Sequence, residues 1–515
     1  MPTALDQLPD DIDALKSLVA DQAARNEQLT TENQRYKTQV LTLTEQLNLA
    51  LARRYAASSE KISPDQVLMF DEAEIDVEAV PDTGDEILVP AHKRKKRGRK
   101  PLPDNLPRVD VVHEIPESAR HCDHDGQLLV EIGEVISEQL DIIPAKIQVI
   151  RHIRKKYACN CGQCIKTAPL PAQPIPRSMA SPGLLAHITV SKYQDALQLY
   201  RQETILQRIG VNIPRATLAN WMIRAGMLIQ PLINLLRDRL LAYDIIQMDE
   251  TTVQVLKEDG KVAQSKSYLW LQRGGPPDQS VVLYDYDPGR GASVPTRLLA
   301  GFTGYLQTDG YDGYNAVVAK NELTHVGCMA HARRKFSEAV KAQGKKKKRG
   351  KAHRGMALIQ KLYRVEKQTR KLDPEDRHAC REQDARPVFD ELRTWLDESL
   401  LQVPPTSATG KALNYLNREW CKLICYLDDG RLEIDNNGAE NAIRPFVVGR
   451  KNWLFSDSVK GVKASANLYS LIETAKANGL EPYAYLRYLF TELPKAETVE
   501  AIEALLPGNL NKGQI

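Results

Sequence analysis

An apolar segment that ends in a carboxylate constrains the fold of this chain more than any other stretch. Residues 245–252 read I-I-Q-M-D-E-T-T, the pattern of a buried strand that carries Asp249 at its tip. A second such segment, G-Y-L-Q-T-D-G, ends in Asp309, and D-N-N-G-A-E-N-A-I-R-P places Glu440 early in a predicted helix. Three carboxylates gathered from distant parts of a chain are costly unless a cation neutralises them. The pattern therefore indicates an enzyme that binds two divalent metal ions through oxygen ligands.

The segments around these acids predict the fold of a catalytic domain over residues 243–480. Three hairpin strands, a helix, a strand, a helix and a strand give the order of a ribonuclease-H-like α/β sheet. In that arrangement the first and fourth strands are neighbours, so Asp249 and Asp309 are expected side by side, with Glu440 closing the metal site from a later helix. The predicted strands are 245–256, 267–271, 279–286, 305–308 and 324–328, and the predicted helices are 293–302 and 329–340.

A long, charged, mostly helical segment, 341–431, interrupts this domain and is expected to be an insertion. It contains the basic run K-K-K-K-R-G-K, which suits a DNA backbone or, equally, a solvated loop. Residues 481–515 are expected to form a helical tail with no assigned chemistry.

A seven-residue repeat over residues 8–50 predicts one long helix, within an N-terminal coiled-coil domain of residues 1–52. Such a seam buries itself against a partner helix, which favours a parallel homodimer or a higher oligomer; an amphipathic helix packed on its own chain is the alternative. The two seam positions hold Leu8, Leu15, Gln22, Leu29, Tyr36, Leu43 and Ala50, and Ile12, Val19, Asn26, Asn33, Val40 and Leu47.

A charged linker is expected over residues 53–113, where an acidic tract precedes the basic run K-R-K-K-R-G-R-K-P. Arg97, Arg99 and Lys100 of this run suit contact with DNA phosphates or an A·T-rich minor groove. The alternative is a solvated tether that binds its acidic neighbour.

Residues 114–178 are expected to form a small β-rich, zinc-finger-like module with cysteines towards its two ends. The second knuckle has good zinc spacing, whereas the first has Asp125 where a second cysteine would complete C-x-x-C. If zinc binds, the substitute ligand is His121, His124 or Asp125, or else Cys159, and a degenerate site without metal is the alternative. The candidate zinc ligands are Cys122, Cys159, Cys161 and Cys164.

Residues 179–242 predict helices that include a helix-turn-helix, with Gly210 in the turn and Arg215 at the start of the second helix. Such a pair can seat its second helix in a major groove, although many helix pairs never touch DNA. Two further groups of side chains are expected near the catalytic site as DNA contacts. They are His331, Arg333, Arg334 and Lys335 in one helix, and Arg444, Arg450, Lys451 and Trp453 in another.

Composition adds two limits. No run of about 18 apolar residues is present, so no spanning helix and no membrane partner are expected. The N-terminus lacks an apolar signal core, which favours a reducing cytoplasm and metal binding over a disulfide framework for the eight cysteines.

Together these segments resemble the transposases of the insertion sequence 66 family of bacterial mobile elements. The resemblance rests on M-D-E-T, Q-T-D-G-Y, C-M-A-H-A-R-R-K-F, A-E-N-A-I-R-P, R-K-N-W-L-F and S-L-I-E-T-A-K-A-N-G, with S-S-E-K and G-R-K-P-L-P upstream. It implies a DDE transposase with Asp249, Asp309 and Glu440 as ligands of two Mg²⁺ or Mn²⁺ ions. It also implies accessory proteins of the same element and a bacterial, nucleoid-associated location. Asn441 and Asp125 depart from the family pattern, in which an arginine and a cysteine are usual.

The resemblance and the residues lead to one functional hypothesis. The chain is expected to bind the ends of a mobile element, to cleave DNA by metal-dependent hydrolysis, and to join the 3′-hydroxyl ends to target DNA. Two rival hypotheses are a nuclease or junction resolvase of the same fold without strand transfer, and a DNA-binding protein with an inactive catalytic domain.

Overall fold

The computed structural model describes residues 11–54, 147–158, 165–343, 350–510 and 513. By its internal contacts the chain divides into a large unit, Met1–Val80 with Pro171–Ile515, and a small one, Pro81–Leu170. Within the described ranges, no helix is both long and apolar enough to cross a membrane.

Helix α1 (Ile12–Arg54) confirms the long N-terminal helix that the seven-residue repeat predicts. Its apolar seam faces solvent in the single chain, because Ile12, Val19, Leu29, Tyr36, Val40, Leu43 and Leu47 are all about half exposed or more. Near the C-terminal end of α1, Asn48 Nδ2 donates a hydrogen bond to the carbonyl of Ala342, and Glu45 Oε2 accepts one from the backbone of Ala408. The helix therefore meets its own chain near its end and leaves the seam uncovered.

The small unit contains an antiparallel pair of strands, β1 (Lys156–Ala158) and β2 (Ile165–Thr167). Just outside the pair, Arg154 Nε donates to the carbonyl of Ala168 at 2.6 Å. Residues 159–164, which connect the two strands and carry the second cysteine knuckle, lie outside the described ranges.

Four helices precede the sheet: α3 (Pro182–Tyr193), α4 (Leu199–Arg208), α5 (Arg215–Leu228) and α6 (Gln230–Leu241). They confirm the predicted helical region, with α4 and α5 as the expected helix pair. The turn between them contains Gly210 at φ +82°, a left-handed conformation that glycine adopts without steric cost.

The central sheet has the strand order β5-β4-β3-β6-β7, with β8 pairing separately with β3. The strands are β3 (Ile245–Lys257), β4 (Lys266–Gly274), β5 (Val281–Asp287), β6 (Tyr305–Gln307), β7 (Thr324–Val326) and β8 (Ser456–Ser458). Neighbours β3, β4 and β5 are antiparallel, whereas β6 and β7 run parallel to β3. All five predicted strands are present, and the first and fourth are neighbours as expected.

Helix α16 (Val459–Ala477) covers the edge of this sheet at β5. Thr474 Oγ1 accepts from the backbone N–H of Val282 and donates to its carbonyl, and Ser470 Oγ accepts from the N–H of Tyr284. These two helix residues lie four apart on one face, so they pair with alternate strand residues and satisfy an exposed strand edge. The S-L-I-E-T motif thereby closes the sheet.

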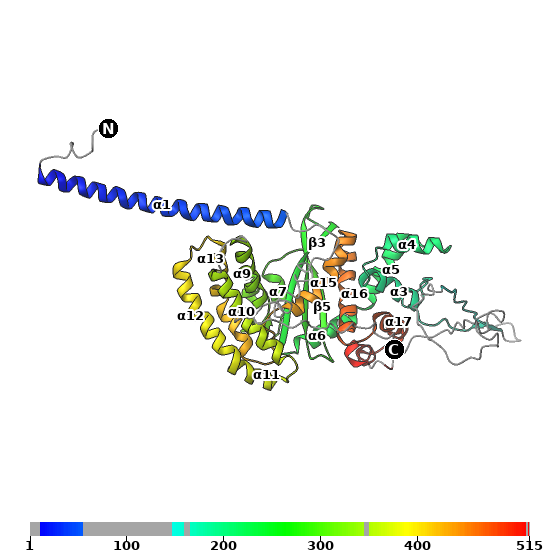
Figure 1. Ribbon diagram of the computed structural model, residues 1–515. Helices are drawn as coiled ribbons and strands as arrows, with labels where there is room; N and C mark the ends of the chain where they lie inside the picture. Colours follow the sequence, from blue (N-terminus) through cyan, green and yellow to red (C-terminus); the bar gives the residue numbers. More distant parts are fainter. Residues whose placement is uncertain (1–10, 55–146, 159–164, 344–349, 511–512, 514–515) are drawn as a thin grey trace, which may run out of the picture. The chain divides into compact units, whose positions relative to one another are not determined.

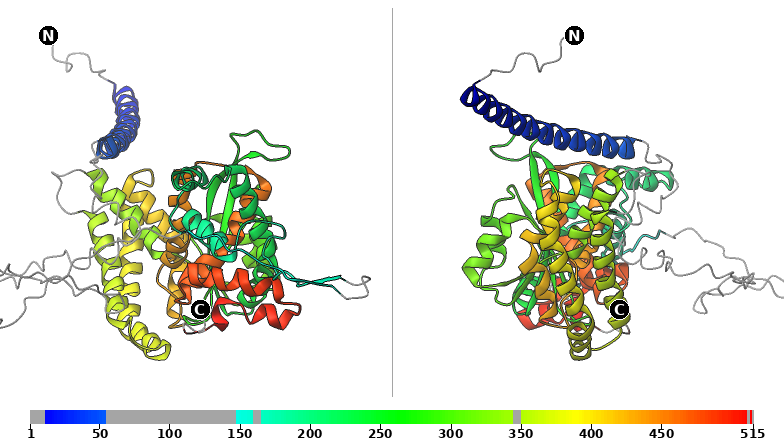
Figure 2. Two further views of the ribbon diagram at one scale, coloured as in Figure 1. Left: turned by 90° about the vertical axis from the view of Figure 1, so that its right-hand side faces the viewer. Right: turned by 60° about the vertical axis from the view of Figure 1, so that its left-hand side comes forward.

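Helices cover the sheet on both sides. Figures 1 and 2 show the yellow helices of the insertion on one side of the green strands and α16 with α17 (Pro482–Glu492) on the other. The helices of the β7 side are α9 (Met329–Gln343), α10 (Lys351–Thr369), α11 (Pro374–Cys380), α12 (Arg386–Gln402), α13 (Ala408–Arg418) and α14 (Trp420–Ile424). They share a core of their own around Phe336, Phe389 and Leu413, which fits the predicted helical insertion.

Shorter elements complete the chain. The predicted helix that begins at residue 293 is α7 (Ser293–Leu298), and α8 (Asn315–Asn321) follows β6. Helix α15 (Asn437–Trp453) crosses back to the sheet, and α18 (Val499–Glu503) lies in the predicted tail. Helix α8 occupies the place of the helix that the predicted order has between the fourth and fifth strands, although no residues were assigned to it, whereas β8 was not predicted; both are short and lack a clear periodic pattern.

Candidate active site

The register of two parallel strands places Asp249 and Asp309 next to each other. Gln247 of β3 lies opposite Gln307 of β6, and each aspartate follows two residues later in its strand direction. The side chains of the two glutamines are also joined, since Gln247 Nε2 donates to Gln307 Oε1 at 2.7 Å. Asp309 lies just beyond the end of β6, near enough for its charge to raise the pKa of Asp249, and the pairing of the two aspartates as metal ligands stays a prediction.

Asp249 is half-buried, and its environment is strongly acidic. Burial raises its pKa well above the ordinary value, and the neighbouring charges of Glu250, Glu440 and Asp309 raise it further. One hydrogen bond opposes this, because Asp249 Oδ1 accepts from the backbone N–H of Glu250 at 2.8 Å. The carboxylates of all three predicted ligands thus act on one another electrostatically.

Glu440 reaches this site from the first turn of α15. Its side chain is almost fully buried, and Oε1 has no hydrogen-bond partner. Burial raises the pKa of Glu440 from 4.5 to about 7, Asp435 and Asp309 raise it as well, and only Arg334 lowers it. A buried carboxylate oxygen without a partner is unusual and calls for a ligand.

The D-N-N segment before α15 fixes the position of Glu440. Asn436 Nδ2 donates to the carbonyl of Met248, the residue before Asp249, at 2.8 Å. The backbone N–H of Asn436 donates to Cys328 Sγ at 3.2 Å. One buried asparagine therefore ties the start of α15 both to β3 and to the end of β7.

Asp435 supports the same turn from the other side. It accepts from the hydroxyl of Tyr363 at 2.8 Å and from the backbone and side chain of Asn437. Burial raises its pKa to about 6. These contacts link the inserted helix α10 to the helix that carries Glu440.

A fourth acid of the site, Glu250, did not emerge as a site residue from the sequence. Its side chain is only 2% exposed, and it accepts from Tyr314 at 2.6 Å and from Arg290 at 2.6 Å. Arg290 also lies 3.9 Å from the ring centroid of Tyr311, two residues after Asp309. Its position directly after Asp249 in M-D-E-T is the signal that could have marked it.

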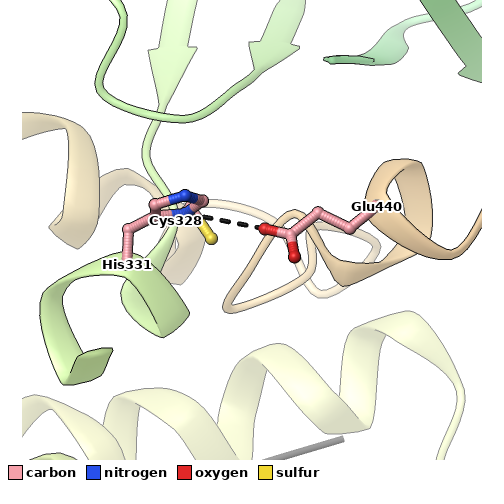
Figure 3. Close-up of side chains that lie close together, drawn as sticks. All are labelled: Cys328, His331 and Glu440. Carbon is pink, nitrogen blue, oxygen red and sulfur yellow. Dashed lines mark ion pairs between the residues drawn. The ribbon is translucent and has the colours of Figure 1, made fainter. Parts of the chain in front are cut away.

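Two side chains of α9 lie beside Glu440. Arg334 Nη2 is 3.7 Å from Glu440 Oε2, and His331 Nδ1 is 3.6 Å from Oε1. Burial and the charge of Arg334 lower the pKa of His331 to about 4, so this imidazole is neutral at pH 7 and the contact carries no ionic attraction. Figure 3 shows Cys328 and His331 on one side of this contact and the Glu440 carboxylate, from α15, on the other.

The oxygen donors suit a hard divalent cation. Asp249 is half-buried and Glu440 is buried, both have raised pKa values and they repel each other, so a cation relieves these costs. The Glu440 atom without a partner fits the same conclusion. Among described residues, however, the group whose ligand atoms lie within 4.8 Å of one another is Cys328, His331 and Glu440, not the three predicted acids.

The residues of α9 that were predicted to contact DNA lie in three different environments. His331 and Arg334 adjoin Glu440, and Arg333 is buried at 2% exposure inside the helix packing. Lys335 is exposed and lines a shallow pocket. The other residues of that pocket are Lys411, Asn414, Tyr415 and Arg418 of α13.

The predicted contacts of α15 are also divided. Arg450 Nη1 donates to the side chains of Thr251 and Thr252 on β3, so its guanidinium binds within the fold. Trp453 packs edge-on against Phe446, with ring centroids 5.3 Å apart, whereas Lys451 is exposed and Arg444 is half-buried. DNA contact by these residues stays a prediction.

The remaining predicted residues lie outside this site. Arg215 is exposed at the start of α5, and its backbone N–H donates to Glu203. Arg97, Arg99, Lys100, Cys122, Cys159, Cys161 and Cys164 lie outside the described residues, so their roles stay predictions.

Comparison with protein families gives four matches along the chain. A model described as "Transposase IS66 family" matches residues 177–464, and "IS66 C-terminal element" matches 470–507. The "zinc-finger binding domain of transposase IS66" matches residues 119–162. A fourth model, "Transposase C of IS166 homeodomain", matches residues 42–111.

Similar full-length proteins occur in Sinorhizobium fredii (strain NBRC 101917 / NGR234). The uncharacterized protein y4jD is 33% identical over 95% of this chain and 99% of its own length. The uncharacterized protein y4qI is 32% identical over 99% of this chain and 98% of its own length. The similarity therefore extends over almost the whole chain.

Proposed function

The chain belongs to the IS66 family of transposases, and on that premise we propose that Asp249, Asp309 and Glu440 form the active site of a DDE transposase. The observation that supports the proposal is that Glu440 of α15 and Asp309, just after β6, lie near enough to Asp249 of β3 for their charges to raise its pKa. The proposed activity is metal-dependent cleavage of DNA at the ends of a mobile element, followed by joining of the ends to target DNA.

The proposal includes a ribonuclease-H-like catalytic domain. The strand order β5-β4-β3-β6-β7 supports it, as does the change from antiparallel to parallel pairing at β3. In such a sheet the first strand is central, and the acid of the fourth strand lies beside the acid of the first. The inserted helices lie between α9 and α15 in the sequence, and the chain comes back to the sheet with α15, which carries Glu440.

The protein's own residues would prepare the site for two divalent ions. Asp249, Asp309 and Glu440 would supply the oxygen ligands. Asn436 would hold Glu440 in reach of Asp249, and Arg290 would keep Glu250 in its own ion pair. When bound, Mg²⁺ or Mn²⁺ would activate the attacking oxygen and stabilise the leaving oxygen at phosphorus.

The proposed reaction has two steps, which differ in the nucleophile that attacks phosphorus. In the first step water would attack at the end of the element and free a 3′-hydroxyl. In the second step that hydroxyl would attack target DNA, so a phosphodiester bond forms as another breaks and no covalent protein intermediate is needed. Near the site, Arg334 and Lys335 are the cations best placed to hold a phosphate, since Arg333 is buried.

DNA binding and assembly form the second part of the proposal. The zinc-finger model over residues 119–162 and the exposed Arg215 support binding of element ends. The exposed apolar seam of α1 supports a homodimer, because pairing would cover it. We propose a bacterial cytoplasmic protein, associated with the nucleoid, that acts with accessory proteins of the same element.

The test is an in-vitro reaction with DNA that carries the element's own ends and a target plasmid. The expected result is nicking in Mg²⁺ but not in EDTA, followed by joined products, and loss of both with Glu440→Gln. Nicking without joined products under every condition would favour a nuclease or resolvase. End binding without cutting, even with the accessory proteins added, would contradict the proposal and favour an inactive DNA-binding protein.

A further inference from the structure

A cysteine and a histidine three residues apart share Glu440 with the proposed catalytic site. Cys328 lies between β7 and α9, and His331 lies in the first turn of α9. With Glu440 they offer one sulfur, one nitrogen and one oxygen ligand atom, all within 4.8 Å of one another (Figure 3). The proposed cleavage reaction uses neither the thiol nor the imidazole.

Two of these atoms are buried and have no hydrogen-bond partner. They are His331 Nδ1 and Glu440 Oε1, which lie 3.6 Å apart. Buried polar atoms nearly always have a hydrogen-bond partner. Two such atoms that face each other at this distance without one indicate that a ligand, such as a metal ion, binds between or beside them. Cys328 Sγ, also buried, accepts the backbone N–H of Asn436 at 3.2 Å, but burial and the charges of Asp435 and Glu440 hold the pKa of the thiol well above its ordinary value, so the thiolate forms only when a metal ion binds it.

We propose that Cys328, His331 and Glu440 bind a borderline-soft transition-metal ion of the Zn²⁺ class. Thiolate and imidazole donors select such ions, whereas the acids of the proposed catalytic site suit Mg²⁺. In a tetrahedral zinc site the ligand atoms lie about 3.4–3.7 Å apart. The distance between the His331 and Glu440 atoms, 3.6 Å, lies in this range, and the sulfur needs a shift of at most about 1.4 Å to reach it.

Binding has a defined proton balance. The thiol of Cys328 releases its proton to solvent, and the proton of neutral His331 resides on Nε2. Arg334 Nη1 now lies 3.5 Å from that Nε2 and moves away, which its 37% exposed side chain permits. The metal then supplies the positive charge that Arg334 gives to Glu440.

The consequence rests on the proposed function, because both sites share Glu440. An ion held by Cys328 and His331 draws the Glu440 carboxylate into its own coordination shell. The oxygen site then lacks one of its three acids. Zn²⁺ therefore inhibits Mg²⁺-dependent cleavage through a thiol whose one contact with the proposed catalytic site, the backbone N–H of Asn436, a serine hydroxyl can also accept; inhibition is scored against each variant's own rate without Zn²⁺.

The test uses the full chain as wild type, Cys328→Ser and the matched control Cys421→Ser, whose thiol is exposed and distant in sequence. After dialysis against Zn²⁺, Cys328→Ser should retain one ion fewer per chain than the other two proteins. The zinc-finger cysteines contribute equally to all three, so the difference isolates the new site. With Co²⁺, the thiolate-to-metal absorption should be weaker in Cys328→Ser alone.

Cleavage is measured in parallel with added Zn²⁺. Wild type and Cys421→Ser should be inhibited, whereas Cys328→Ser should need about tenfold more Zn²⁺, the loss expected for a missing metal-site partner. Equal metal content and equal Co²⁺ spectra in all three proteins would overturn the inference, even if all cleave DNA. Failure of all three to cleave would count against the proposed function alone, since metal content is read separately. His331→Gln repeats the metal measurement if Cys328→Ser does not fold.

Discussion

Replacing Glu440 with glutamine should stabilise the metal-free protein while it abolishes DNA cleavage. Burial raises the pKa of Glu440 from 4.5 to about 7. The native state therefore keeps this proton to a higher pH than the unfolded state does. The stability that depends on it is fully present below pH 4.5 and is lost as pH rises through about 7.

The magnitude follows from the same difference in pKa. A rise from 4.5 to about 7 corresponds to roughly 3 kcal/mol of unfolding free energy that wild type loses between these pH values. Glutamine has nearly the same shape and does not titrate, so Glu440→Gln keeps that stability. At pH 8 in EDTA it should exceed wild type by up to roughly 3 kcal/mol, and at pH 5 the gap should be much smaller.

Thermal unfolding of the full chain provides the assay. In a domain of this size 1 kcal/mol shifts the melting temperature by about 2 °C, so a difference of several degrees is expected at pH 8. Glu398→Gln on α12 is the matched control, because that side chain is exposed. Added Mg²⁺ should raise the melting temperature of wild type more than that of Glu440→Gln. A variant no more stable than wild type at pH 8, or a gap independent of pH, would refute the reasoning.

Three further perturbations have defined outcomes. Gly438→Ala should lower stability by about 1 kcal/mol or less in thermal melts and should weaken cleavage in nicking assays, because its Cβ would push aside the ends of the Arg273 and Gln247 side chains, and Gln247 is bonded to Gln307. Arg290→Gln should destabilise the fold by about 1–3 kcal/mol in thermal melts, since it leaves the buried carboxylate of Glu250 without its cation. Leu43→Asp should convert a dimer to a monomer in light scattering, because a charge would enter the α1 seam; an unchanged mass would contradict the seam's role.

Much of the sheet was predictable because its strands carry strong local patterns. The apolar run through residues 245–256 predicted a strand that the structure places at Ile245–Lys257. The neighbouring positions of Asp249 and Asp309 followed from strand order alone. Short elements such as β8, with only three residues, are set by tertiary contacts and left no readable pattern.

The surroundings of the acids were less predictable, because they depend on contacts between distant residues. Nothing in the sequence showed that Arg290 would pair with Glu250 or that Asn436 would bond to Met248. Arg450 illustrates the same limit, since a cation expected to contact DNA binds two threonines of β3. The type of each side chain suggested which chemistry it could serve, whereas the residue that it contacts depends on how distant parts of the chain pack together.

The most direct test of the central claim is single-turnover cleavage of element-end DNA in Mg²⁺ by wild type, Asp249→Asn, Glu440→Gln and the double variant. If the acids form one metal site, each single change should remove several kcal/mol of transition-state stabilisation, a loss of about 10³-fold or more. The double variant should then cleave no more slowly than either single variant, because the site acts as a unit. Near-wild-type cleavage by either single variant, or losses that multiply in the double variant, would contradict the three-carboxylate site.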